Sequence, residues 1–190
     1  EASQQATFGP TIISGLQSIN KEYIQSLIDI KEDQCFKRDK INTSRLSLLR
    51  SNLISQVKID IGDIENGRVS TSYEVNERHH RTIKAGIGYS SDEGAYITSG
   101  WEHRNFGGTG ERLDLSTRLS SIRQKVLGEY FIPAFFNIDN SLTLYSEAKN
   151  EELDAYELHA LKAGAKIGFK KTKHLKYSIG AELKISEIND

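Results

Sequence analysis

Hydrophobic residues recur with two different periods along this chain, and the period changes near residue 80. Before that point, apolar residues at helical spacing predict two helices, one from about Lys21 to Ile30 and one near Asn42–Leu53. In the second helix, Leu46, Leu49 and Leu53 fall on one stripe, which predicts that this stripe faces a core.

The period is two on either side of a predicted hairpin turn that follows the second helix. Apolar residues alternate with polar ones in Val57–Ile61 and again in Val69–Val75. Between them, Asn66-Gly67 is the residue pair typical of a two-residue hairpin turn. Because the β-prone stretch Thr7–Leu16 precedes the helices, the predicted order over 7–78 is strand, helix, helix, strand, strand.

From Arg81 onward the pattern predicts strands only, joined by hairpins into a long antiparallel meander. The seven predicted strands are Arg81–Tyr89, Ala95–His103, Leu113–Leu119, Val126–Ile132, Ser141–Lys149, Tyr156–Phe169 and Leu175–Ile185. The alternation changes phase near Ala160-Leu161, which predicts a bulge or a break in the sixth strand.

Alternation by itself does not say which face of these strands meets water, so a soluble barrel and a membrane barrel are both open. Three details favour a membrane. Several strands reach the ~9–11 residues that a tilted membrane-spanning strand needs. The apolar faces carry almost no charge, and the aromatic residues Tyr89, Trp101 and Tyr130 fall near strand ends. We therefore expect the apolar rows to face hydrocarbon and the Lys, Asp and Ser rows to face a wet interior.

Composition adds mainly exclusions. The 25 Lys and Arg residues nearly balance 26 Asp and Glu residues, so nothing indicates nucleic-acid binding. No apolar run approaches the ~20 residues of a membrane-spanning helix. A single cysteine, Cys35, excludes an internal disulfide. The chain starts without Met and stops directly after a predicted strand, so we expect a truncated or processed chain.

Candidate chemistry is weak throughout. Gly107–Gly110 is glycine-rich but lacks the Lys-Ser/Thr of a phosphate loop, and a hairpin turn explains it better. His79-His80 has no metal-ligand spacing to other histidines, and a solvated linker is the better interpretation. Glu151, Glu152 and Asp154 are expected in a polar hairpin tip without an acid or base partner. We predict no catalytic, cofactor-binding or metal site, and no enzyme activity.

Three motifs of the second half resemble the BamA/TamA superfamily. Ala85–Gly94 is similar to its opening barrel strand, and Trp101–Gly110 resembles its W-x-x-R-N-x-x-G-x-G turn between the second and third strands. Tyr130–Pro133 matches the Y-x-x-P that closes the fourth strand. Within the superfamily, the pattern looks closest to TamA-like proteins.

Residues 7–78 resemble a POTRA module, which has the same β-α-α-β-β order. Gly9-Pro10 and Gly15 match its opening strand, and Leu49–Val57 matches its L-x-x-x-L-x-x-x-V passage into the second strand. Many POTRA modules carry a glycine in the connector where this chain has Asp33, so we expect a local change in loop geometry there.

The resemblance implies an α+β POTRA module at 7–78, placed in the periplasm, followed at 81–190 by about seven strands of a sixteen-stranded transmembrane β-barrel that is incomplete in this chain. It implies an outer-membrane assembly or insertion factor. The expected partners are unfolded outer-membrane or autotransporter client polypeptides, a periplasmic or inner-membrane-anchored partner protein, and the lipid bilayer. Neither nucleic acid nor a cofactor is expected.

The function implied by this resemblance would lie in the first barrel strand, whose backbone could serve as a template for a client strand at a lateral seam. The candidate seam residues are Arg81, Ile83, Ala85, Gly86, Ile87, Gly88 and Tyr89. The two glycines would make the strand deformable, or they would only relieve crowding against the barrel interior. Two alternatives are open: a secretion translocator of the same superfamily that passes a polypeptide through its lumen, and a soluble β-barrel binding protein.

Overall fold

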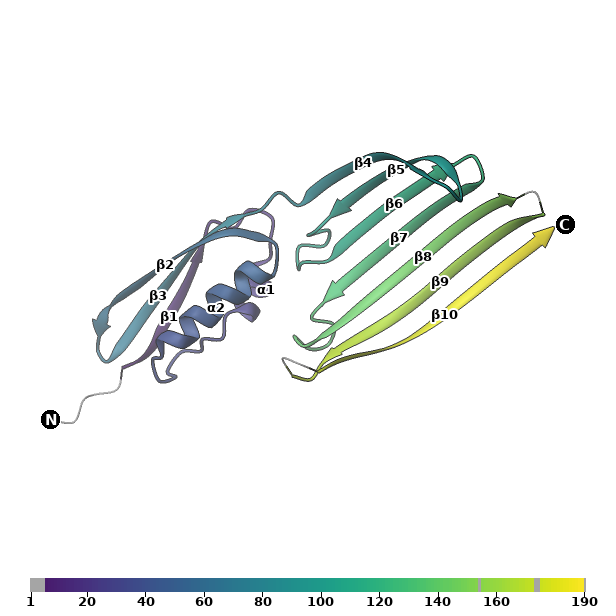
Figure 1. Ribbon diagram of the computed structural model, residues 1–190. Helices are drawn as coiled ribbons and strands as arrows, with labels where there is room; N and C mark the ends of the chain where they lie inside the picture. Colours follow the sequence, from purple (N-terminus) through teal and green to yellow (C-terminus); the bar gives the residue numbers. More distant parts are fainter. Residues whose placement is uncertain (1–5, 154, 173–174, 190) are drawn as a thin grey trace. The chain divides into compact units, whose positions relative to one another are not determined.

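The computed structural model describes residues 6–153, 155–172 and 175–189 (Figure 1). By its contacts the chain divides into two units. The first runs up to His79 and includes Gly108–Gly110, and the second holds His80–Gly107 and the residues from Glu111 onward. Each unit has its own sheet.

The first unit contains the predicted strand, helix, helix, strand, strand order. Its elements are β1 (Thr7–Ser14), α1 (Lys21–Leu27), α2 (Arg38–Arg50), β2 (Ile54–Glu65) and β3 (Arg68–Glu77). The sheet order is β1-β3-β2, with β1 parallel and β2 antiparallel to the central strand β3. Asn66 and Gly67 both have positive φ, 51° and 78°, which confirms the predicted two-residue hairpin turn.

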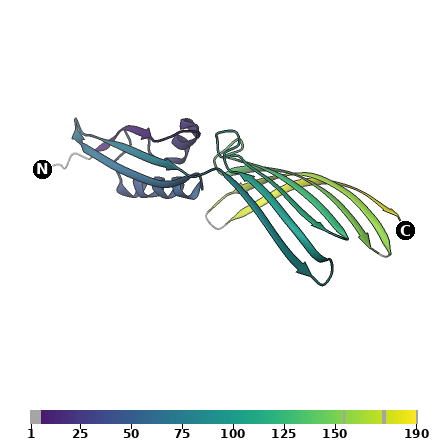
Figure 2. The ribbon, with the colours of Figure 1, turned by 90° about the horizontal axis from the view of Figure 1, so that it is seen from above.

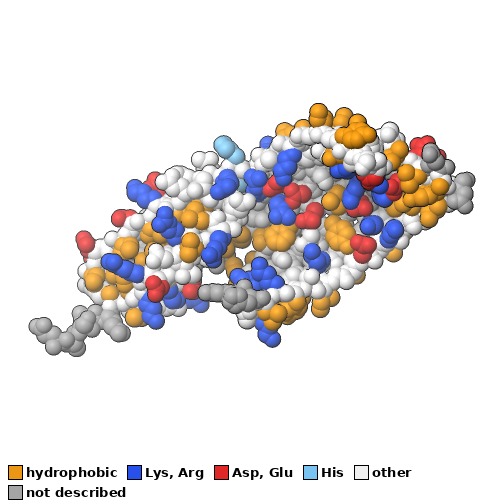
Figure 3. Space-filling model, in the orientation of Figure 1, with side chains coloured by type: hydrophobic (Ala, Val, Ile, Leu, Met, Phe, Trp, Pro, Cys, Tyr) orange, Lys and Arg blue, Asp and Glu red, His pale blue; other side chains and the backbone are white. Residues whose placement is uncertain are grey.

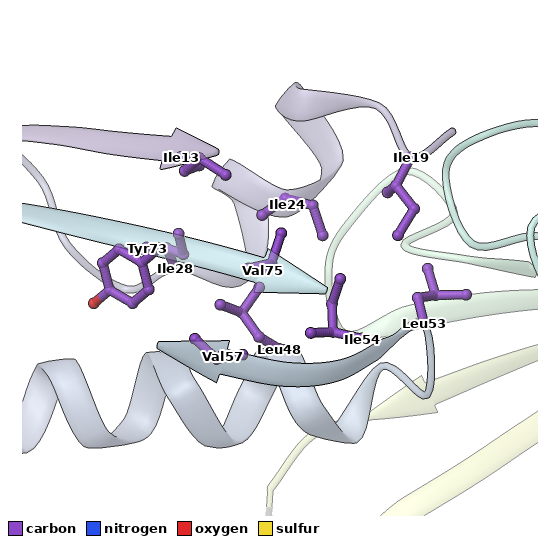
Figure 4. Packing of buried hydrophobic residues seen from close by; sticks show 10 residues of the cluster. All are labelled: Ile13, Ile19, Ile24, Ile28, Leu48, Leu53, Ile54, Val57, Tyr73 and Val75. Carbon is purple, nitrogen blue, oxygen red and sulfur yellow. The ribbon is translucent and has the colours of Figure 1, made fainter. Parts of the chain in front are cut away.

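Apolar side chains from both helices and all three strands form the core of this unit (Figure 4). They are Ile13, Ile19, Ile24, Ile28, Leu48, Leu53, Ile54, Val57, Tyr73 and Val75. The unit therefore has the closed apolar interior of a small independent module.

The second helix is displaced from its predicted position and presents a different stripe to the core. It begins at Arg38 and ends at Arg50, because Asn52 adopts a left-handed conformation (φ 64°) that turns the chain into β2. Leu48 is fully buried, whereas Leu46 is 48% exposed. The predicted stripe was therefore wrong at Leu46.

The connector between the helices keeps the conformation that a glycine would favour. Asp33 has a φ of 63°, and its N–H donates to the carbonyl of Phe8 at 2.9 Å. Asp tolerates this left-handed region better than most residues do, and the expected change in loop geometry relative to other POTRA modules stays a prediction.

Within the described residues, the second unit is one sheet of seven strands, each paired antiparallel with the next in the chain (Figure 2). The strands are β4 (Arg81–Ser90), β5 (Gly94–His103), β6 (Arg112–Ser120), β7 (Arg123–Pro133), β8 (Asn140–Leu153), β9 (Tyr156–Lys170) and β10 (Lys176–Asn189). This confirms the predicted meander.

The predicted bulge in the sixth of these strands was wrong. β9 pairs with β8 and with β10 in unbroken register. The apolar–polar alternation seemed to change phase because each face of β9 carries both kinds of residue. One face carries Leu158 and Ala160 and, farther along, Lys162 and Lys166. The other face carries His159 and then Leu161. A regular strand therefore exchanges its apolar and polar faces near one end.

The two faces of this sheet differ in chemistry and exposure. The outer face, as we call it, carries Ile83, Ile87, Tyr89, Ile97, Leu115, Leu119, Val126, Leu144, Leu161, Ile179, Leu183 and Ile185, all at least 40% exposed. The inner face carries Lys84, Glu102, Asp114, Arg118, Arg123, Lys125, Glu147, Lys149, Glu151 and Lys162. Figure 3 shows charged side chains gathered in a hollow of the molecule. The apolar rows thus do not converge on a dry centre.

Among the described residues, neither helix is long and apolar enough to cross a membrane.

Candidate functional site

The candidate seam strand, β4, forms one end of the seven-stranded sheet. It pairs with β5 without interruption from Arg81 opposite His103 to Ser90 opposite Gly94. No described strand pairs with its other edge. Since alternate residues of a strand point their N–H and C=O groups to opposite sides, about half of these groups in β4 face that free edge.

The predicted seam residues divide between the two faces of β4. Arg81, Ile83, Ala85, Ile87 and Tyr89 share the outer face, where Ile83 and Ile87 are 83% and 88% exposed. Gly86 and Gly88, which complete the predicted set, lie on the inner face. The strand therefore presents a free backbone edge beside an exposed apolar surface, as a strand would need to pair in a lipid environment.

Gly88 has a packing role, because the ring of Tyr96 on β5 occupies the space beside it. A Cβ atom at Gly88 would lie 2.3 Å from Cζ of Tyr96. At Gly86 a Cβ would lie 2.9 Å from Oγ1 of Thr98, which is the end of a rotatable side chain. These contacts support the crowding interpretation of the glycines, and Gly88 supports it more strongly than Gly86.

Beside the first half of β4, a small group of charged and polar side chains lies on the inner face. Lys84 Nζ lies 2.9 Å from Oε2 of Glu102, and Oε1 of Glu102 lies 2.7 Å from Nε of Arg104. Arg104 also donates to Oγ1 of Thr82 at 3.0 Å. These contacts join β4 to β5 and to Arg104, the residue that follows β5.

At the opposite end of β4, the hairpin turn to β5 contributes a buried carboxylate. The side chain of Glu93 is 0% exposed and accepts hydrogen bonds from Arg118 at 2.6 Å and from Arg123 at 3.1 Å. Arg123 also donates to Glu151, which pairs with Lys149. We call these five residues the Glu93 cluster.

The sequence did not identify the Glu93 cluster. Glu151 was expected in a polar hairpin tip, but it lies within β8 and is 5% exposed, so its expected position was wrong. Asp154 lies outside the described residues. A sequence signal existed in the alternation of Arg118 and Arg123 with apolar residues, which places both on the polar face. The strand register that brings Glu93 to Arg118 and Arg123 could not be predicted from the sequence.

Aromatic residues mark both ends of the strands on the outer face. Trp101, His103, Phe106 and Tyr130 contact one another in succession, with ring centroids 5.8–6.2 Å apart. Tyr89 lies at the opposite end of β4 and is 79% exposed. Amphipathic rings at both ends of an apolar band match the arrangement at the two interfaces of a bilayer.

In the first unit, a carboxylate ties the end of β3 to the loop that precedes α1. Glu77 accepts hydrogen bonds from the N–H groups of Gln17, Ser18 and Ile19 and from the hydroxyl of Ser18. Burial raises the pKa of Glu77, but these hydrogen bonds have the larger effect and bring the pKa down to about 2. Glu77 is therefore ionised at neutral pH and stabilises this loop.

Comparisons with known proteins agree with both units. Residues 6–78 match the POTRA family, described as a surface antigen variable number repeat. Over 181 residues the chain is 21% identical to the outer membrane protein assembly factor BamA of Neorickettsia risticii (strain Illinois), covering 94% of this chain and 24% of that protein.

Solved structures share the fold over essentially the whole chain. BamA from Haemophilus ducreyi lacking POTRA domains 1–3 has a TM-score of 0.86 at 19% identity, covering 100% of this chain and 37% of that one. CdiB from Acinetobacter baumannii (TM-score 0.64, 13% identity) and CdiB from Escherichia coli (0.69, 10%) match 98% of this chain and 39% and 38% of theirs. This chain thus spans well under half the length of these relatives.

The chain thus combines a POTRA module with a sheet of antiparallel strands whose outer face is apolar and exposed. Over both units, the chain has the fold of the solved BamA and CdiB structures. An outer-membrane location for the strands and a periplasmic one for the POTRA module agree with the similarity to an outer membrane protein assembly factor. The exposed apolar outer face argues against the soluble-barrel alternative. The matches name BamA and CdiB proteins, and the TamA-like assignment stays a prediction.

Proposed function

We propose that this chain is part of an outer-membrane protein assembly factor that uses β4 as a template for client strands. The observation that carries the proposal is the position of β4 as an end strand of the described sheet, next to an exposed apolar outer face. The assembly factor BamA of Neorickettsia risticii, to which the chain is similar, supports the same assignment.

The physical reason lies in the cost of unpaired backbone groups in lipid. Hydrocarbon offers no hydrogen-bond partner, so a client strand that enters the membrane alone leaves its N–H and C=O groups unsatisfied, at several kcal/mol each. Pairing with β4 satisfies these groups as the strand enters. The driving force is the hydrogen bonding and burial of the client itself, so the proposal requires no cofactor and no catalytic step.

The proposed partners follow from this mechanism. They are unfolded outer-membrane or autotransporter polypeptides at β4, and a periplasmic or inner-membrane-anchored protein at the POTRA module. The POTRA sheet has two outer strands, β1 and β2, that could receive an extended segment by the same strand addition.

Disulfide trapping in the complete protein tests the proposal. Ala85 on β4 and Ser99 on β5 lie opposite each other in register, so Ala85→Cys and Ser99→Cys form a matched pair at one level of the sheet. A stalled client with single cysteines along one strand should cross-link to the Ala85 position and not to the Ser99 position. Equal cross-linking at both positions, or none at β4, would refute the template role.

The second candidate function is polypeptide secretion through the barrel interior. Two observations support secretion as an alternative: the structural similarity to two CdiB proteins and the charged inner face of the sheet. A polypeptide in transit would contact inner-face positions such as Ser116 on β6 and not the free edge of β4. Cross-linking of a transported polypeptide to Ser116→Cys, with none to Ala85→Cys, would therefore favour secretion over assembly.

A further inference from the structure

The Glu93 cluster connects the turn of the first hairpin to strands that are not its neighbours. Glu93 belongs to the turn between β4 and β5, whereas Arg118 lies on β6, Arg123 begins β7, and Glu151 lies on β8. Both carboxylate oxygens of Glu93 are used, Oε1 by Arg118 and Oε2 by Arg123. The tip of the hairpin is therefore tied by side chains across three further strands.

A second contact carries this connection into β4 itself. The guanidinium of Arg118 lies over the ring of Tyr96, 3.6 Å from its centroid, and the same ring occupies the space beside Gly88. An arginine over an aromatic face gains from cation–π attraction. Arg118 thus contacts both Glu93 in the turn and the ring that covers the end of β4.

The contacts of Lys84 with Glu102 and of Thr82 with Arg104 join the first half of β4 to β5 and to the residue that follows β5. The Glu93 cluster joins the turn end of the same hairpin to three further strands, β6, β7 and β8.

We propose that Glu93 is a positioning residue that latches the turn end of the first hairpin onto β6–β8. With the turn end held in this way, a client strand pairs first at the end of β4 that begins at Arg81. This last consequence depends on the template role proposed for β4, but the latch itself does not.

The burial of Glu93 explains why this contact should dominate the stability of the turn end. A buried carboxylate loses its hydration, and two arginines with hydrogen bonds to both oxygens compensate for that loss. Removing the charge leaves two arginines without their shared partner, so the hairpin tip should open more often. The adjacent Asp92 offers a matched control, because its side chain is 71% exposed and 3.9 Å from Arg123.

Hydrogen exchange of the complete protein in detergent tests the latch without any client. With Glu93→Gln, amides near the turn, in Ile87–Tyr89 and Ala95–Ile97, should exchange about tenfold faster, and those in Arg81–Lys84 should change less than about twofold. Asp92→Asn should change neither group. Equal effects of the two substitutions, or uniform acceleration along β4, would overturn the proposal.

Two further measurements protect the test against a variant that fails to fold. The double variant Glu93→Gln with Arg118→Gln should exchange no faster than the faster single variant, because both remove the same contact; multiplied effects would contradict the latch. In the unmutated protein, the turn end of β4 should exchange more slowly than the Arg81 end, and the reverse order would overturn the proposal. Loss of client cross-linking with intact exchange protection would refute the template role alone.

Discussion

Gly88 and Tyr96 lie opposite each other on β4 and β5, and the missing side chain of one makes room for the ring of the other. Such a pair covers the backbone of a glycine with an aromatic ring and strengthens an otherwise weak point of the sheet. A template strand can therefore carry a glycine without losing order at that position.

Gly88→Ala should destabilise the barrel because its Cβ would lie 2.3 Å from the Tyr96 ring. We expect a loss of about 1–3 kcal/mol, the usual cost of overpacking. Gly86→Ala is the control, since its Cβ meets a hydroxyl that can rotate away. The heat-induced gel shift of the complete protein measures the difference, and an equal loss for both variants would contradict this role of Gly88.

Glu77 should make the stability of the first unit depend on pH. Its folded-state pKa of about 2 lies below its ordinary value of 4.5, so its contribution is fully present above pH 4.5 and is lost as the pH falls towards 2. Because the carboxylate is partly exposed and screened, we expect about 1–2 kcal/mol.

Urea unfolding of residues 6–78 between pH 2 and 6 checks this dependence. Glu77→Gln should remove most of the pH dependence in that window. Glu74→Gln is the matched control, because Glu74 is exposed and pairs with exposed Lys58 at 3.3 Å. A Glu77→Gln profile parallel to that of the unmutated module would count against the interpretation.

At the scale of elements, the position of α2 decides which leucines stabilise the POTRA module. Leu48→Ala should cost about 2–5 kcal/mol, because the side chain is fully buried and its removal leaves a cavity. Leu46→Ala should cost less than about 1 kcal/mol, since Leu46 is 48% exposed. Chemical denaturation of the module compares them, and similar losses would contradict the placement of α2.

The same helix shows what could be predicted from the sequence and what could not. Apolar spacing predicted that a helix exists, but its phase was misread because Ser44, a polar residue, is buried in the core-facing stripe. Its hydroxyl accepts the N–H of Asp29 and donates to the carbonyl of Lys40, which compensates for its burial. The strands were predicted more accurately, since period two leaves only two faces to choose between.

Part of the candidate site could also be predicted from the sequence. β4 and its glycines could be identified because they lie in one continuous strand. Glu93 could not, because its partners lie 25 and 30 residues away and meet it only when the register of three hairpins is fixed. Side-chain networks that cross several strands therefore need coordinates, even where each strand can be predicted from its alternation.

At the scale of the whole molecule, the seven described strands of this chain form an open sheet. β4 and β10 are its two outer strands, and β10 is exposed along its whole length. Unpaired edges and an uncovered apolar face both favour association with other chains. The POTRA module differs in the second of these features, because most of its large apolar residues meet in a closed core.

The isolated chain should therefore aggregate, exchange strands between copies or require detergent, whereas residues 6–78 alone should be monomeric in buffer. Size-exclusion chromatography with light scattering, with and without detergent, measures both. Both samples contain the POTRA sheet, and only the 190-residue chain contains the open strands. A difference in association between them is therefore caused by the open strands. A folded, monodisperse 190-residue monomer in plain buffer would mean that the apolar outer face is covered by something other than lipid, and it would remove the basis for β4 as a template in the membrane.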